Sequence, residues 1–193
     1  IAVTESWRAQ LQRLLLERGL PAVFPTVVAR TGWTTGDLAA AIREKPPAGR
    51  FELVTLLVGF NNPYLGETPD QYRVELRGLL QSALGFASGP GRVIVLSLPD
   101  WGATPFAAGR DRTAIGGAID AFNEVNRTEC LGWRMRYVDI TTFSRRAVDD
   151  PSLTVADGLH PSAALYREWA RLVLPEALDA LGVTEARARE YAG

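Results

Sequence analysis

The chain has 193 residues, of which 47% are hydrophobic and 22% are charged, and this composition is typical of folded globular proteins. Its formal net charge is −1, and acidic and basic residues are interspersed, so the sequence indicates no surface for nucleic acid or an anionic membrane. One cysteine and one histidine rule out an internal disulfide and argue against a Cys/His zinc site, and no apolar run approaches the ~18 residues of a membrane span.

Helix-like apolar stripes alternate with short β-branched runs along the chain. The first stripe predicts a helix over residues 5–18, capped near Thr4 and ended by Gly19. Residues 22–29 (AVFPTVVA) then predict a strand, and residues 38–42 (LAAAI) a short helix. Further strands are expected over residues 51–59, 92–99 and 136–140, and further helices over 69–84, around 115–122 and from 165 to about 180, before a polar tail at 185–193.

This alternation favours a single α/β domain over residues 1–193, built on a mostly parallel sheet with helices on both faces. Ligands of such sheets bind at the carboxyl ends of the strands. The loops that follow the strands are therefore the places to look for chemistry.

The motif DGLHP at residues 157–161 contains the only histidine of the chain and directly precedes the last amphipathic helix. An aspartate three residues before a histidine can accept a hydrogen bond from one imidazole nitrogen and leave the other as a general base. Asp157 and His160 are therefore candidate catalytic residues. The alternative is a turn aspartate beside a surface histidine, with Pro161 opening the helix.

Two other loops could stabilise a negative charge. In GFNN (59–62), Asn61 follows the most apolar strand and offers a side-chain amide, although glycine and asparagine are also common in plain turns. In RTGWTTGDL (30–38), the backbone N–H of Gly32 can approach a ligand closely because glycine has no Cβ, although a turn leading into a helix explains the same residues.

The chain resembles the SGNH hydrolase family, in its GDSL-like lipase/acylhydrolase branch, over nearly its whole length. Four motifs carry this resemblance, in the order TGWTTGDL, VGFNN, SLPDWGATPFA and DGLHPS. The resemblance implies a flavodoxin-like three-layer sandwich and a serine ester hydrolase that acts on a small-molecule ester without a cofactor or metal. It assigns Gly32 and Asn61 to the oxyanion hole, Asp157 to the orienting acid and His160 to the base.

The sequence departs from the family pattern at two points. Asn62 stands where the family block G-x-N-D carries an aspartate, which we expect to change hydrogen bonding in the loop. No GDS block is present either, so we expect the nucleophilic serine and the first strand in about ten or more residues upstream of Ile1. Ser6, Ser97 and Ser162 are better explained by helix starts and a strand end.

A rival interpretation is a carbohydrate- or lipid-binding module that kept the fold and lost the chemistry. A flavodoxin-like nucleotide-binding or receiver domain is disfavoured, because phosphate-binding glycines and an acidic cluster after the strands are both missing. We expect a soluble protein, while its oligomeric state and a cytoplasmic or secreted location stay open.

Overall fold

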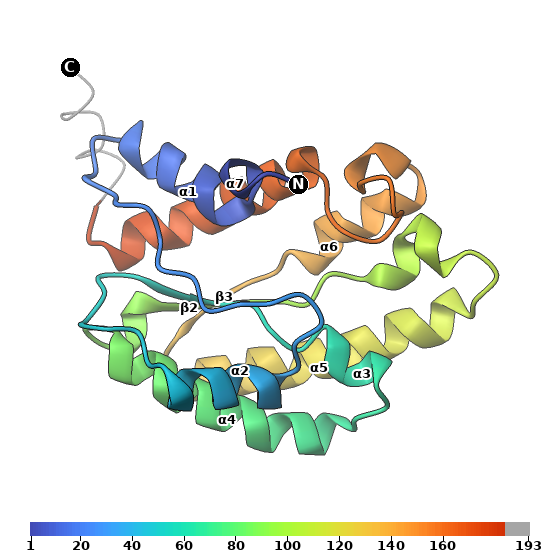
Figure 1. Ribbon diagram of the computed structural model, residues 1–193, viewed down its shortest axis with the longest axis horizontal. Coiled ribbons are helices and arrows are strands. Elements are labelled where there is room, and N and C mark those ends of the chain that lie inside the picture. Colours follow the sequence, from blue (N-terminus) through green and yellow to red (C-terminus); the bar gives the residue numbers. More distant parts are fainter. Residues whose placement is uncertain (184–193) are drawn as a thin grey trace.

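The computed structural model describes residues 1–183 and shows a parallel sheet between two layers of helices (Figure 1). Strands β1 (Val54–Leu56), β2 (Val93–Leu96) and β3 (Arg136–Val138) lie in that order, and both neighbouring pairs are parallel. The α/β sandwich predicted from the alternating pattern is therefore confirmed. The polar tail at 185–193 lies outside the described residues.

The helices cover both faces of the sheet. They are α1 (Trp7–Leu16), α2 (Thr35–Glu44), α3 (Asn61–Tyr64), α4 (Pro69–Phe86), α5 (Arg112–Gly132), α6 (Thr141–Ser144) and α7 (Ala163–Ala180). Helices α1 and α7 lie on one face, and α2, α4 and α5 lie on the other (Figure 1). The apolar core is divided in the same way, with one cluster around Tyr72 and Phe122 and another around Trp7 and Trp169. None of the helices in residues 1–183 has the length and hydropathy needed to cross a membrane.

The first helix begins later than predicted, because its cap is Ser6 and not Thr4. The Ser6 hydroxyl accepts a hydrogen bond from the Ala9 N–H, while Thr4 lies in a separate 3₁₀ turn, Val3–Glu5. The predicted stop is close to the observed one. Gly19 follows the helix with a φ of 75°, a left-handed conformation that glycine adopts without strain.

The strand predicted at 22–29 was wrong. The segment is extended, but it forms no ladder with another strand, and Val23 is 84% exposed. A strand exists only where a neighbour takes up its N–H and C=O groups. Here a groove lined by both segments separates residues 22–29 from β1, so the predicted extended backbone has no partner in the described part of the chain.

The carboxyl ends of β2 and β3 are tied together by buried polar side chains. Asn123 of α5 accepts a hydrogen bond from the Leu98 N–H at 2.6 Å and donates one to the Thr141 hydroxyl at 2.9 Å. The Ser97 hydroxyl accepts from the Ile140 N–H at 2.8 Å. These bonds fix the edge of the sheet at which the loops gather.

Candidate active site

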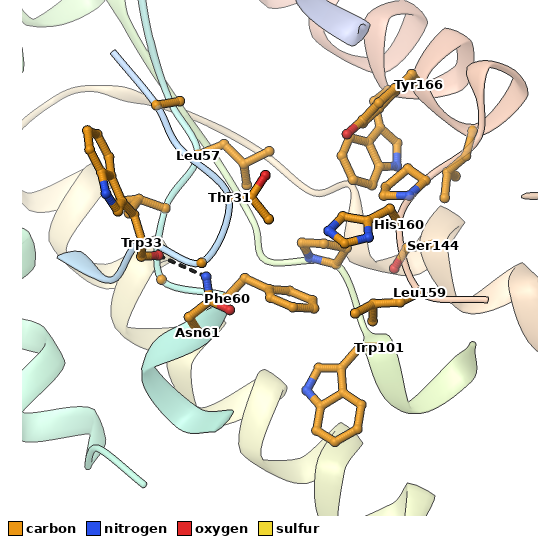
Figure 2. A pocket seen from close by; sticks show the side chains of 18 of the residues that line it. Thr31, Trp33, Leu57, Phe60, Asn61, Trp101, Ser144, Leu159, His160 and Tyr166 are labelled. Carbon is orange, nitrogen blue, oxygen red and sulfur yellow. Dashed lines mark hydrogen bonds between the residues drawn. The ribbon is translucent and has the colours of Figure 1, made fainter. Parts of the chain in front are cut away.

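A cleft of about 380 Å³ lies at the carboxyl ends of the strands. Figure 2 shows side chains entering it from the loop after β1, from the loop after β2 and from the segment leading into α7. Its apolar lining is rich in aromatic rings: Trp33, Phe60, Trp101, Tyr166 and Trp169. The cleft is therefore shaped for a small molecule with apolar parts.

His160 and Asp157 form a hydrogen-bonded pair at one side of this cleft. The imidazole Nδ1 lies 2.7 Å from the Asp157 Oδ2. The other carboxylate oxygen accepts from the backbone N–H groups of Leu159 at 2.8 Å and of His160 at 2.9 Å. These two N–H groups, followed by the imidazole, lower the pKa of the Asp157 carboxyl to about 2. Asp157 is thus ionised at neutral pH.

An ionised carboxylate can only accept hydrogen bonds, so Nδ1 of the neutral imidazole must carry the proton in this pair. The lone pair then lies on Nε2. His160 itself lines the cleft, whereas Asp157 lies behind it and does not. This arrangement prepares Nε2 to accept a proton from a group inside the cleft.

The loop that carries the pair is closed by backbone contacts. The Val155 N–H donates to the His160 carbonyl at 2.9 Å, and the Phe106 N–H donates to the Gly158 carbonyl at 3.0 Å. Gly158 has a φ of 70°, and a Cβ there would lie 3.1 Å from the Cβ of Pro105. The glycine of DGLHP is therefore needed for both backbone conformation and space.

Asn61 lies across the cleft from His160 (Figure 2), and Gly32 also lines the cleft. The Asn61 Nδ2 donates to the Trp33 carbonyl at 2.9 Å, which fixes the amide and leaves its second hydrogen unassigned. Gly32 has a φ of 87° and nothing within 4 Å of a Cβ placed on it. The structure thus brings three of the four predicted site residues to one cleft and places the fourth behind His160.

The turn before Asn61 is set by a glycine under tight steric constraint. Gly59 has a φ of 113°, and a Cβ there would lie 2.6 Å from the Tyr72 hydroxyl. Tyr72 is fully buried, and its hydroxyl donates to the Asn126 Oδ1 at 2.7 Å. The Gly59 backbone lies so close to the Tyr72 ring that no side chain fits at position 59, which explains the glycine of GFNN.

Asn62 is fully buried in a network that joins the loop at 59–62 to the start of α2. Its Oδ1 accepts from the Thr35 N–H at 3.2 Å, and its Nδ2 donates to the Thr35 hydroxyl at 2.6 Å and to the Glu67 carboxylate at 2.7 Å. The Thr35 hydroxyl in turn donates to Glu75. Sequence reasoning missed Thr35 and Glu75, because nothing in the sequence signals contacts that span 27 and 40 residues. It also missed Glu67, which lies only five residues from Asn62.

Asn62→Asp restores the family's usual residue, yet we expect it to destabilise this protein. A carboxylate at position 62 loses the donor to Glu67 and sets two negative charges against each other in a buried site. The expected cost is about 1–3 kcal/mol, measured by urea unfolding at neutral pH. The loss should shrink as the pH is lowered and a carboxylate is protonated.

The matched control adds Glu67→Gln to Asn62→Asp, which puts an amide donor back opposite the new carboxylate. We expect most of the lost stability to return in this double variant. A stable Asn62→Asp protein, or a double variant no better than the single one, would show that the network does not depend on the asparagine amide.

Ser144 is the only serine among the residues that line the cleft. It is 3% exposed, its hydroxyl donates to the Thr141 carbonyl at 2.7 Å, and it accepts from the Asp100 N–H at 2.9 Å. Ser6 and Ser162 cap α1 and α7. Within the described residues, each of these serines is thus engaged in structure.

Of the aromatic residues that follow β1 and β2 in the chain, some line the cleft and others pack behind its wall. Phe60 and Trp101 line the cleft. Tyr64 and Phe106 instead pack edge-on against Trp101, with ring centroids 5.6 and 6.1 Å away. Trp101 is therefore held rigidly as one wall.

Comparisons with solved structures show the same fold. TesA shares 23% identity, with 94% of this chain and 91% of TesA covered, at a TM-score of 0.65. A lipolytic G-D-S-L family protein from Veillonella parvula shares 15% identity, covering 93% and 88%, at 0.68. A variant of an acetyl xylan esterase from Geobacillus stearothermophilus shares 22% identity, covering 89% and 81%, also at 0.68. No curated protein matches the sequence significantly.

The family itself is established by sequence. Residues 2–168, which are most of the chain, match the profile of the GDSL-like Lipase/Acylhydrolase family. The resemblance seen in the four ordered motifs is therefore confirmed. With its parallel sheet, its strand-end cleft and this match, the chain belongs to the GDSL-like lipase/acylhydrolase family of hydrolases.

Proposed function

We propose that the protein hydrolyses a carboxylic ester through an acyl-enzyme, with His160 as general base and Asp157 as the carboxylate that orients it. The observation that carries the proposal is the 2.7 Å contact between His160 Nδ1 and an ionised Asp157, which leaves Nε2 as the basic nitrogen beside the cleft. The nucleophile is a serine supplied by residues that precede Ile1.

In the first half of the reaction, the serine hydroxyl gives its proton to Nε2 of His160 while its oxygen forms a bond to the ester carbonyl carbon. The carbonyl oxygen becomes an oxyanion, which accepts hydrogen bonds from the Gly32 N–H and from the free amide hydrogen of Asn61. The imidazolium then protonates the leaving alcohol as its bond to the acyl carbon breaks. Water repeats the sequence on the acyl-enzyme and releases the acid.

The site fits this role in its shape and charge. A cleft of about 380 Å³ is large enough for a small ester, and its aromatic walls can contact the apolar parts of that ester. Asp157 supplies the negative charge that stabilises the imidazolium formed in each half-reaction. The acetyl xylan esterase and lipolytic neighbours act on esters according to their own descriptions, which agrees with this chemistry.

The test uses what we call the extended protein, which is this chain together with the residues that naturally precede Ile1. We expect it to hydrolyse a short-chain aryl ester and to be labelled once by a serine-reactive phosphonate. Mass spectrometry should place the label before Ile1. A folded extended protein that does neither would overturn the proposal and favour a carbohydrate- or lipid-binding module on the same fold.

A further inference from the structure

The proposed mechanism fixes which part of an ester lies beside His160. The carbonyl oxygen points toward the oxyanion donors, and the leaving oxygen must lie within hydrogen-bond reach of His160 Nε2, from which it takes its proton. The acyl group, as the remaining substituent of the carbonyl carbon, then points away from the imidazole. Side chains next to His160 are therefore expected to contact the alcohol part of the ester.

The loop after β2 supplies a wall on this side of the cleft. It carries Trp101, which lines the cleft. The same loop is joined to the histidine loop, because the Phe106 N–H donates to the Gly158 carbonyl at 3.0 Å. Figure 2 shows Trp101 next to Leu159, the residue before His160. Trp101 thus lies on the side of the cleft where the alcohol part is expected.

Trp101 is packed on the sides that face away from the cleft, and its side chain is only 8% exposed. Tyr64 and Phe106 meet the indole edge-on. The Arg110 guanidinium lies over both rings, 5.7 Å from the centroid of Trp101 and 5.0 Å from that of Phe106, which adds a cation–π attraction. Rotation of the indole away from the cleft would break these contacts together, so it forms a rigid wall.

The backbone on either side of Trp101 is held by the Asp100 carboxylate, which is buried. Its Oδ1 accepts from the Gly102 N–H at 2.8 Å, and its Oδ2 accepts from the Arg145 Nε at 2.9 Å. The Arg145 guanidinium is held in turn by Asp120 at 2.7 Å. The ion pair therefore joins the loop that carries Trp101 to the segment that follows β3.

Two glycines leave room for this carboxylate. A Cβ on Gly102 would lie 2.9 Å from the Asp100 Oδ1, and a Cβ on Gly116 would lie 3.2 Å from its Oδ2. A buried ion pair adds little net stability compared with apolar residues of the same shape. Its main consequence here is the position that it gives to the neighbouring indole.

We propose that Trp101 limits the size of the alcohol part of the ester, and that the Asp100–Arg145 ion pair positions Trp101. The proposal rests on the proposed function and deepens it, because it names a class of substrate for the same cleft. Esters of small alcohols fit beside the indole, whereas a branched or ring-shaped alcohol part collides with it. The limit is sharp because the wall is rigid.

Ligand binding needs no nucleophile, so it tests the wall on the present chain without an activity assay. Cyclohexanol is titrated, and the amide NMR shifts of Leu159 and Asn61 report binding in the cleft. Trp101→Ala and the milder Trp101→Leu should bind cyclohexanol roughly tenfold more tightly than the wild type, the scale on which an apolar pocket discriminates a methylene group.

The matched control is Trp133→Ala, because Trp133 packs against the same core cluster as Trp101 but does not line the cleft. This variant should bind cyclohexanol as the wild type does. An equal gain in the control, or no gain in either Trp101 variant, would overturn the proposal.

The role of the ion pair has its own test. Arg145→Met removes the cation and should shift the indole N–H resonance of Trp101 and raise the affinity for cyclohexanol, though less than Trp101→Ala does. Arg145→Lys keeps a cation beside Asp100 and should restore most of the wild-type behaviour. An Arg145→Met protein with an unchanged resonance and unchanged affinity would show that the pair does not position Trp101.

Kinetics on the extended protein tests the assignment to the alcohol side. Trp101→Ala should raise kcat/KM for cyclohexyl acetate relative to ethyl acetate roughly tenfold, while the ratio between ethyl butyrate and ethyl acetate stays the same. The reverse pattern would place Trp101 on the acyl side and overturn the proposal. If the extended protein has no esterase activity but the Trp101 variants gain affinity for cyclohexanol, the serine mechanism is overturned and the size limit set by Trp101 is supported.

Discussion

Replacing His160 with alanine in the extended protein is expected to lower kcat for a short-chain ester by about 10²–10⁴-fold, the contribution of a well-placed general base. Nε2 is the group that would take the serine proton, and the chain has no second histidine to replace it. The serine should also lose its reactivity toward a phosphonate. Wild-type esterase activity in His160→Ala would remove the basis of the mechanism.

Asp157→Asn should have a loss of similar order, because an amide can donate to Nδ1 and so favour the wrong tautomer of His160. The matched control is Asp150→Asn. Asp150 accepts from the Ser152 N–H and hydroxyl, at 3.1 and 2.6 Å, and does not line the cleft. We expect this control to keep kcat unchanged. If both variants lose kcat equally, the loss reflects a loop that tolerates no substitution and gives no support for Asp157 as the residue that orients His160.

The low pKa of Asp157 also predicts how the stability of its loop depends on pH. Because folding lowers this pKa from 3.8 to about 2, the hydrogen bonds of the carboxylate stabilise the loop fully above pH 3.8 and are lost as the pH falls through about 2. At the pH of an esterase assay Asp157 thus stays ionised. Protonation of Asp157 should therefore leave the kcat/KM profile of the extended protein unchanged near neutral pH.

Local patterns predicted the long helices and the three strands, because a long helix shows an apolar stripe and a buried strand shows a continuous apolar run. The stripe over 69–84 became α4, and the apolar runs at 51–59 and 92–99 contain β1 and β2. The error at 22–29 arose because a strand depends on its neighbours. A β-branched run shows that extended backbone is favoured, but pairing is a long-range property that the run itself does not encode.

The candidate site was predictable where its chemistry lies in short motifs. Asp157 and His160 are three residues apart, and a turn alone brings them into contact. The contact between Asn62 and Thr35 could not be predicted, since it joins two segments 27 residues apart. The role of Gly59 was hidden for the same reason, because the ring that demands it belongs to Tyr72 on α4. Contacts between segments that are distant in the sequence leave no local pattern from which they could be predicted.

Asn61→Ala should also have a large effect on activity. Removing one oxyanion donor should lower kcat of the extended protein by about 10²–10³-fold, equal to ~2.7–4 kcal/mol of transition-state stabilisation. KM should change little, because the amide acts on charge that develops only in the transition state. Steady-state kinetics on a short-chain aryl ester measures both constants.

The same amide donates to the Trp33 carbonyl, so activity must be separated from loop stability. Losing that bond should cost only about 1 kcal/mol in urea unfolding. Asn61→Asp keeps the shape of the side chain but faces the oxyanion with a negative charge, and it should therefore be less active than Asn61→Ala. If the activities of the two variants instead follow their stabilities, Asn61 only holds the loop, and the oxyanion would have to be stabilised by the Gly32 N–H and backbone groups alone.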